Sequence, residues 1–186
     1  MSIPKKDNPI LDNSGKNCQI NQNGSVWFLA GTFGTFAKRS CTIPSSVALF
    51  FPIIEKECSF AEEGEQIRTE AGLVYRARYL MDLVAHMELC IDDCTVDSLR
   101  RFRAASRVFN LIFPLQNVYG VPNGQTRSVT DGYWIMLRGL ESGKHLIRFC
   151  AEAIIPDGPI KDLAKRFVTV EHDKFRTEVI YELTIL

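Results

Sequence analysis

The sequence predicts a mainly β protein, an antiparallel β-sandwich or barrel with one inserted α-helix at about residues 62–85. Three observations support this prediction. Short runs of apolar and β-branched residues recur between glycines and prolines, which is typical of strands joined by turns. A single segment carries apolar residues at a spacing of three to four, as one face of a helix does. Residues 175–185 alternate between apolar and polar, as a half-buried strand does.

Residues 1–24 are rich in Asn, Asp, Lys and Gly, and they are predicted to form a loop-like N-terminal arm. Residues 25–186 are expected to form one β-sandwich-like domain, because no further shift in composition marks a boundary. Strands are predicted at residues 26–31, 40–43, 47–54, 86–91, 94–96, 108–113, 133–137, 144–150 and 175–185. Pro52 restricts its strand to a sheet edge or a bulge.

The helix is predicted from the apolar positions Ile67, Ala71, Val74 and Met81, which should pack on a sheet. Glutamates near its start would complement the helix dipole. Further along, the turn residues 141–143 are predicted to join the strands at 133–137 and 144–150 into a hairpin. The odd positions of 175–185 are expected to face the core.

The charge balance excludes several classes of protein. The 22 Lys and Arg residues equal the 22 Asp and Glu residues, so no basic excess points to nucleic acid as a partner. No apolar run approaches the roughly 20 residues of a membrane span, so no transmembrane segment is expected. No signal peptide is visible, which predicts a cytoplasmic protein, or an exported one if a leader has been removed.

The six cysteines leave two interpretations open. They could be buried free thiols, or they could form disulfides if the protein is exported, with Cys18 bridged to Cys41. No CxxC pair and no HExxH motif occurs. No metal site and no cofactor is therefore expected.

The segment Asp131–Trp134 is the most informative local unit, because Asp-Gly favours a turn just before a strand. Tyr133 and Trp134 must then point to opposite faces of the sheet. We expect Trp134 to lie in the core and Tyr133 to be exposed as a ligand-binding aromatic.

Four arginines between positions 100 and 107 form the strongest charge feature, and Arg100, Arg101 and Arg103 are candidates for binding an anionic ligand or an acidic partner. The acidic stretch at 55–70 offers an internal counter-charge instead. Both interpretations remain open at this point.

Catalysis would have to use one of three histidines. His145 is the candidate acid/base, with Asp131 or Glu152 as its partner, although a hydrogen-bonded structural histidine is the simpler interpretation. His86 is expected to have a structural role at the helix end. His172 is expected in a solvated turn.

Several segments resemble a group of small, functionally uncharacterised prokaryotic β-sandwich proteins. The segments are WFLAGTFG at 27–34, RSCTIP at 39–44, FFPI at 50–53, SVTDGYW at 128–134 and LxxGxHxIxF at 140–149. The last of these is also similar to strand-turn-strand units of bacterial extracellular β-sandwich modules. The resemblance implies the fold and carries no activity.

These observations favour a non-enzymatic binding module for an unknown ligand or protein partner. One alternative is a small enzyme that uses His145 in a pocket between sheet and helix. Another is a structural or assembly subunit that forms a homo-oligomer through an exposed edge strand.

Overall fold

A computed structural model describes residues 1–158, 170 and 173–186. Two five-stranded sheets face each other, which confirms the predicted β-sandwich and replaces the barrel alternative. Sheet A contains β1 (Val26–Phe28), β3 (Ala48–Ser59), β8 (Gly124–Leu137), β6 (Arg103–Ala105) and β7 (Phe109–Phe113). Sheet B contains β2 (Phe36–Ile43), β10 (Lys174–Ile185), β9 (Gly143–Ile154), β4 (Val84–Ile91) and β5 (Cys94–Thr95).

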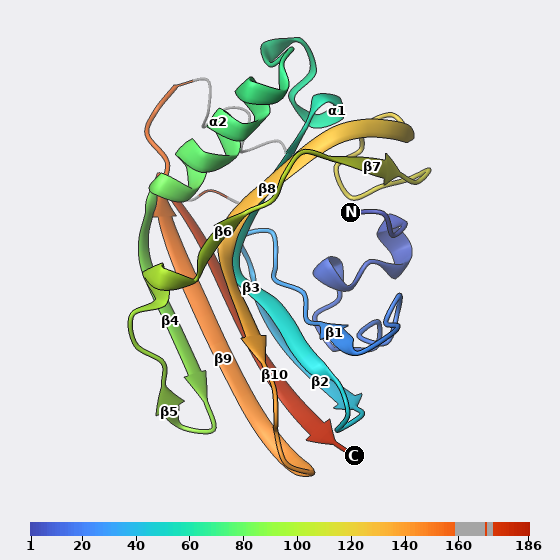
Figure 1. The fold of residues 1–186 in the computed structure, drawn as a ribbon, viewed down its shortest axis with the longest axis vertical. Coiled ribbons are helices and arrows are strands. Elements are labelled where there is room, and N and C mark those ends of the chain that lie inside the picture. The colour runs from blue at the N-terminus through green and yellow to red at the C-terminus, as the bar shows by residue number, and fades with distance from the viewer. Residues whose placement is uncertain (159–169, 171–172) are drawn as a thin grey trace.

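Most neighbouring strands are antiparallel, as predicted, but one edge of each sheet adds a parallel strand. β1 runs parallel to β3, and β2 runs parallel to β10. Short 3₁₀-helices lie at Lys5–Asp7, Pro9–Leu11, Gly64–Gln66 and Leu99–Phe102. Figure 1 shows helix α2 (Glu70–Asp82) beyond the upper end of sheet B, where it packs on β8 and β3. Sheet B and α2 therefore pack against different parts of the same face of sheet A.

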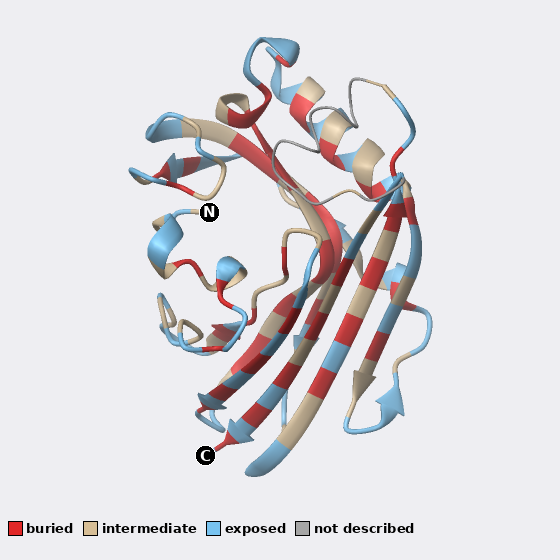
Figure 2. Ribbon diagram, turned by 180° about the vertical axis from the view of Figure 1, so that it is seen from behind, coloured by how far each residue is buried: buried red, intermediate tan, exposed pale blue. Residues whose placement is uncertain are grey.

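The core lies between the sheets and follows the alternation of the strands. The rings of Phe51, Phe149 and Tyr181 stack in series across the two layers, with Phe51 and Phe149 centred 5.3 Å apart. Figure 2 shows the alternating burial along the long strands. In β10, the odd positions from 177 to 185 are buried, which confirms the inward face predicted for this strand.

The helical region is shorter and more divided than the predicted span. A single turn, α1 (Phe60–Glu63), ends at Gly64, whose φ of 59° stops the helix, and α2 begins only after the N-cap Thr69. The buried face of α2 is formed by Leu73, Ala77 and Met81. Of the four expected core positions, Met81 and Ile67 are buried, whereas Ala71 and Val74 are exposed. The prediction was wrong at Ala71 and Val74. The helix begins only at Glu70, and the face that it buries is the one that carries Leu73, Ala77 and Met81.

The predicted hairpin between β8 and β9 does not form. β8 pairs with β3, β6 and β7, whereas β9 pairs with β10 and β4. The residues between them carry the chain from one sheet to the other, as in a sandwich corner. Trp134 and His145 therefore lie in different sheets and not on adjacent strands.

The N-terminal arm packs against the domain and is held there by Arg39. This side chain lies on β2 and is 1% exposed. Its guanidinium donates to the carbonyls of Asp12 (2.6 Å), Gly31 (3.0 Å) and Ala30, and to the hydroxyl of Tyr181 (2.8 Å). Arg39 thus fixes both the arm and the loop after β1 against sheet B.

Cys18 of the arm lies next to Cys41 of β2. Both are free thiols in this structure, and a hydrogen bond from Cys41 lowers the pKa of Cys18. Among the described residues, no helix has the length and apolarity that a membrane crossing needs.

Oxidation is expected to join Cys18 to Cys41, because their side chains are already in contact. Closing this loop should stabilise the protein by on the order of 3 kcal/mol. Urea unfolding of oxidised and reduced protein measures the gain, and Cys18→Ser should abolish it. If oxidised wild type and Cys18→Ser unfold at the same urea concentration, the bridge does not form.

Candidate functional site

The candidate site lies where one edge of β3 loses its neighbouring strand. β1 pairs with β3 only from Ala48 to Phe50. A register shift between Pro52 and Ile54 then bends β3, as the proline in this strand predicts. Glu55 and Glu57 follow this bulge at alternate positions, so both lie on the same face of the strand.

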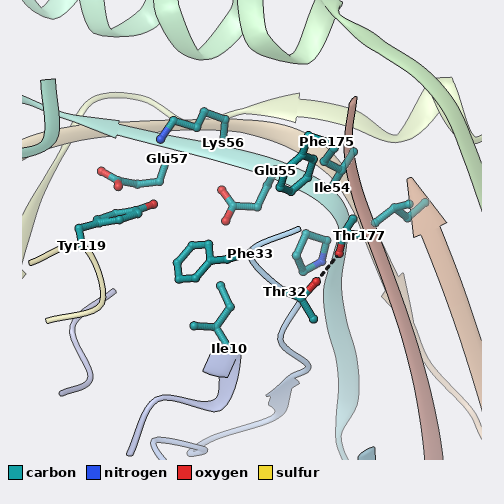
Figure 3. A pocket seen from close by; sticks show the side chains of 13 residues that line it. Ile10, Thr32, Phe33, Ile54, Glu55, Lys56, Glu57, Tyr119, Phe175 and Thr177 are labelled. Carbon is teal, nitrogen blue, oxygen red and sulfur yellow. Dashed lines mark hydrogen bonds between the residues drawn. The ribbon is translucent and has the colours of Figure 1, made fainter. Parts of the chain in front are cut away.

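These carboxylates face a cavity of about 70 Å³. Figure 3 shows Glu55 and Glu57 on the side of β3 that faces Phe33 and Tyr119, with Ile10 of the arm below. The rings of Phe33 and Tyr119 lie 5.7 Å apart. Thr32 and Thr177 close another side and share a hydrogen bond of 2.8 Å between their hydroxyls. The walls are therefore aromatic, aliphatic and hydroxyl, and the charged groups of the lining are the two carboxylates and the ammonium of Lys56.

Glu57 is buried and only partly satisfied. It is 5% exposed, and its Oε1 accepts a hydrogen bond from the Ser128 hydroxyl. Its Oε2 has no hydrogen-bond partner among the described residues. Burial raises the pKa of Glu57 above its ordinary value. An unpaired carboxylate oxygen in this setting is costly unless a proton or a cation occupies it.

Glu55 adds a second carboxylate beside Glu57. Its Oε2 accepts a hydrogen bond of 3.0 Å from Thr130. Burial raises its pKa, and the neighbouring charge of Glu57 raises it further. Within the described part of the chain, neither glutamate forms an ion pair within 4.0 Å.

Two nearby side-chain cations, Lys56 and Arg76, form ion pairs with other carboxylates. Lys56 forms an ion pair with Glu62 of α1, so its charge acts on Glu57 only from a distance. Arg76 of α2 lies 3.7 Å from Glu63. The amino group of Met1 is also close enough to interact with Glu55 and Glu57, whose charges raise its pKa. Burial of the amine has the larger effect, so its pKa is lowered. Lys56 and the Met1 amine therefore act on the two carboxylates through space, without a contact ion pair among the described residues.

His145 lies away from this cavity, at the start of β9. Its Nδ1 lies 2.6 Å from Asp92 Oδ2, and its Nε2 donates to the carbonyl of Glu141 at 2.8 Å. The hydrogen bond to Asp92 raises the pKa of His145, which favours the doubly protonated ring. Neither expected partner pairs with it: Asp131 binds Arg103, and Glu152 binds Lys174. His145 thus connects the segment that carries Glu141 to the turn between β4 and β5 that carries Asp92. Both of its ring nitrogens have hydrogen-bond partners within the protein.

The predicted anion-binding arginines have internal partners in two of three cases. Arg103 donates to both oxygens of Asp131 and also to Asp82, which ties β6 to β8 and α2. Arg100 donates to the carbonyl of Val84. Arg101 lies over the ring of Phe102 at 4.8 Å and is exposed. The counter-charge for Arg103 comes from Asp131 and Asp82, not from the acidic stretch at 55–70.

The two adjacent aromatics of β8 lie on the faces opposite to those expected. Tyr133 is 3% exposed and belongs to the core, so it is not available as an exposed ligand contact. Trp134 is half-buried on the outer face, where it stacks on Phe50 at 5.3 Å and donates to the carbonyl of Ala104. The inward parity of β8 is set by Ile135 and Val129, which the aromatic pair alone does not reveal.

Sequence reasoning missed Glu55 and Glu57, which it treated only as part of an acidic stretch. The available signal was two glutamates at i and i+2 directly after a strongly apolar strand. His172 lies outside the described residues. In comparisons with known proteins, no family model, no curated protein and no solved structure matches this chain.

Proposed function

We propose that this protein is a non-enzymatic binding module whose acidic cavity beside β3 receives a small, positively charged amine. The observation that carries the proposal is the orphan Oε2 of Glu57, a carboxylate oxygen that is buried, unpaired and adjacent to a second carboxylate. A bound ammonium group would supply the missing hydrogen bond and the missing charge together.

The walls favour an organic amine over a bare metal ion. Phe33 offers aromatic surface for a cation or for the methylene groups attached to it, whereas the ring of Tyr119 already has the Lys56 ammonium 5.5 Å from its centre. Ile10 adds aliphatic surface. A hard cation such as Ca²⁺ would need six to eight oxygen ligands, which two carboxylates in a largely apolar cavity do not supply.

The size of the cavity supports binding over catalysis. A volume of about 70 Å³ has room for the charged end of a ligand, since one water needs roughly 10–15 Å³ on the same measure. The module would thus bind the charged end of a larger ligand. The enzymatic alternative gains no support from His145, because both of its ring nitrogens have internal partners.

Titration with methylammonium, followed by amide NMR, tests the proposal. A ligand of two heavy atoms is limited to about 1.5 kcal/mol per atom, so a dissociation constant in the millimolar range is expected. Glu57→Gln and Glu55→Gln should each weaken binding by at least tenfold, whereas Glu65→Gln, an exposed change of the same charge, should not. Equal binding by wild type and Glu57→Gln, or the same shifts with acetate, would overturn the proposal.

The raised pKa of Glu57 makes a separate prediction about stability. Its proton is held more tightly in the folded state, so the stabilisation is complete below the ordinary value of 4.5 and is lost as the pH rises through the folded pKa. Wild type should therefore lose stability relative to Glu57→Gln as the pH rises above about 4.5. Urea unfolding over a series of pH values measures this difference. The prediction would be contradicted if the difference in unfolding free energy between wild type and Glu57→Gln did not change with pH, or if wild type became relatively more stable as the pH rose.

A further inference from the structure

A second cluster of ligating side chains lies on the outer face of sheet B, on β4 and β9, which do not line the acidic cavity. His86 and Glu88 lie at i and i+2 on β4, and Cys150 lies on β9 directly opposite Glu88. All three side chains therefore point to the same face. His86 and Glu88 are exposed, and Cys150 is partly exposed. A metal ion could reach this cluster from solvent.

The ligand atoms of these three residues already converge. Nε2 of His86 lies 2.9 Å from Oε1 of Glu88, and Sγ of Cys150 lies 3.9 Å from Oε2 of Glu88. All of the ligand atoms lie within 4.8 Å of one another. Tetrahedral zinc with bonds of roughly 2.0–2.3 Å places its ligands roughly 3.3–3.8 Å apart. Rotations of the His86 and Glu88 side chains, which are both exposed, would have to close the difference.

We infer that His86, Glu88 and Cys150 form a binding site for a borderline divalent metal ion of the zinc class, with water in the fourth position. The identity of the metal follows from the donor set. A thiolate and an imidazole select zinc and its neighbours over Mg²⁺ or Ca²⁺, which prefer oxygen ligands only. Two ligands on one strand and a third on the next form an open three-ligand site.

The charge around Cys150 agrees with this assignment. Glu88 of β4 and Glu178 of β10 are its directly opposite neighbours on the two sides. A divalent cation bound here would face the carboxylates of both Glu88 and Glu178. Its binding displaces the thiol proton to solvent, which leaves the thiolate as the ligand.

Titration of the reduced full-length chain with Co²⁺, followed by displacement with Zn²⁺, tests the site. A thiolate-to-cobalt charge-transfer band should grow to saturation at one metal per chain and should disappear when Zn²⁺ is added. Cys150→Ser should abolish the band. His86→Ala and Glu88→Gln should weaken binding by more than the roughly 10–100-fold that outer-shell changes cost.

The matched control is Cys90→Ser. Cys90 lies two residues after Glu88 on the same face of β4, opposite Arg148. The substitution Cys90→Ser should leave the cobalt titration unchanged. Glu57→Gln should also leave it unchanged, which separates this site from the proposed amine cavity. A band that survives in Cys150→Ser, a band that is lost in Cys90→Ser, or the absence of saturable binding would overturn the assignment. In the last case, His86 and Glu88 form only a surface hydrogen bond.

Discussion

Replacing Arg39 with Met is expected to destabilise the protein by about 3–5 kcal/mol, because the buried carbonyl of Asp12 and the partly buried carbonyl of Gly31 lose this donor. The carbonyls of Asp12, Ala30 and Gly31 all accept from this one guanidinium. Methionine fills a similar volume, so the loss measures hydrogen bonding more than packing. Urea unfolding at constant pH gives the free energy directly.

The control for this change is Lys38→Met on the neighbouring position of β2. Lys38 is exposed and pairs with Glu182 at 2.7 Å, a surface contact that should be worth about 0–1 kcal/mol. If both variants lose the same small amount, the arm does not depend on Arg39. If Arg39→Met is destabilising as expected, the N-terminal arm and the loop after β1, which both line the cavity, should also be held less firmly in place. Arg39→Met should then weaken methylammonium binding without touching either glutamate.

Tyr133→Ala is expected to cost about 3–5 kcal/mol, as other large-to-small changes of buried aromatics do. Tyr133 is 3% exposed and lies beneath the Arg103 guanidinium, which is 5.9 Å from the centre of its ring. The loss therefore combines a cavity in the core with a weakened support for Arg103.

Trp134→Ala provides the comparison at the adjacent position of the same strand. It removes the stack on Phe50 and one hydrogen bond to Ala104, contacts that together should be worth about 1–2 kcal/mol. Thermal or urea unfolding of both variants ranks them. A larger loss for Trp134→Ala than for Tyr133→Ala would contradict the assignment of the two faces.

The predictions that the structure confirms came from local features of the sequence, such as the alternation of apolar and polar residues along a strand. β10 shows its buried odd positions because eleven alternating residues outweigh any single exception. Pro52 predicted the bulge in β3 because proline cannot donate to the ladder. These features are encoded within a few neighbouring residues, so a sequence alone reveals them.

Pairing between distant segments was not predictable in the same way. The residues at 141–143 are typical of a hairpin turn, yet β8 pairs with β3, β6 and β7, whereas β9 pairs with β10 and β4 in the other sheet. Likewise, two adjacent aromatics at 133 and 134 do not say which of them faces inward. The acidic cavity depends on Glu55 and Glu57, on the arm and on the loop after β1, and only the tertiary fold brings these together.

The anchor formed by Arg39 has a consequence for how this protein tolerates change. Its bonds to residues 10, 12, 30 and 31 reach backbone oxygens only, so they do not depend on which side chains those residues carry. Substitutions at Ile10 and Phe33 could thus reshape the cavity while the segments that carry them stay in place. Selection, natural or in the laboratory, could change the ligand preference of this site without first rebuilding its frame.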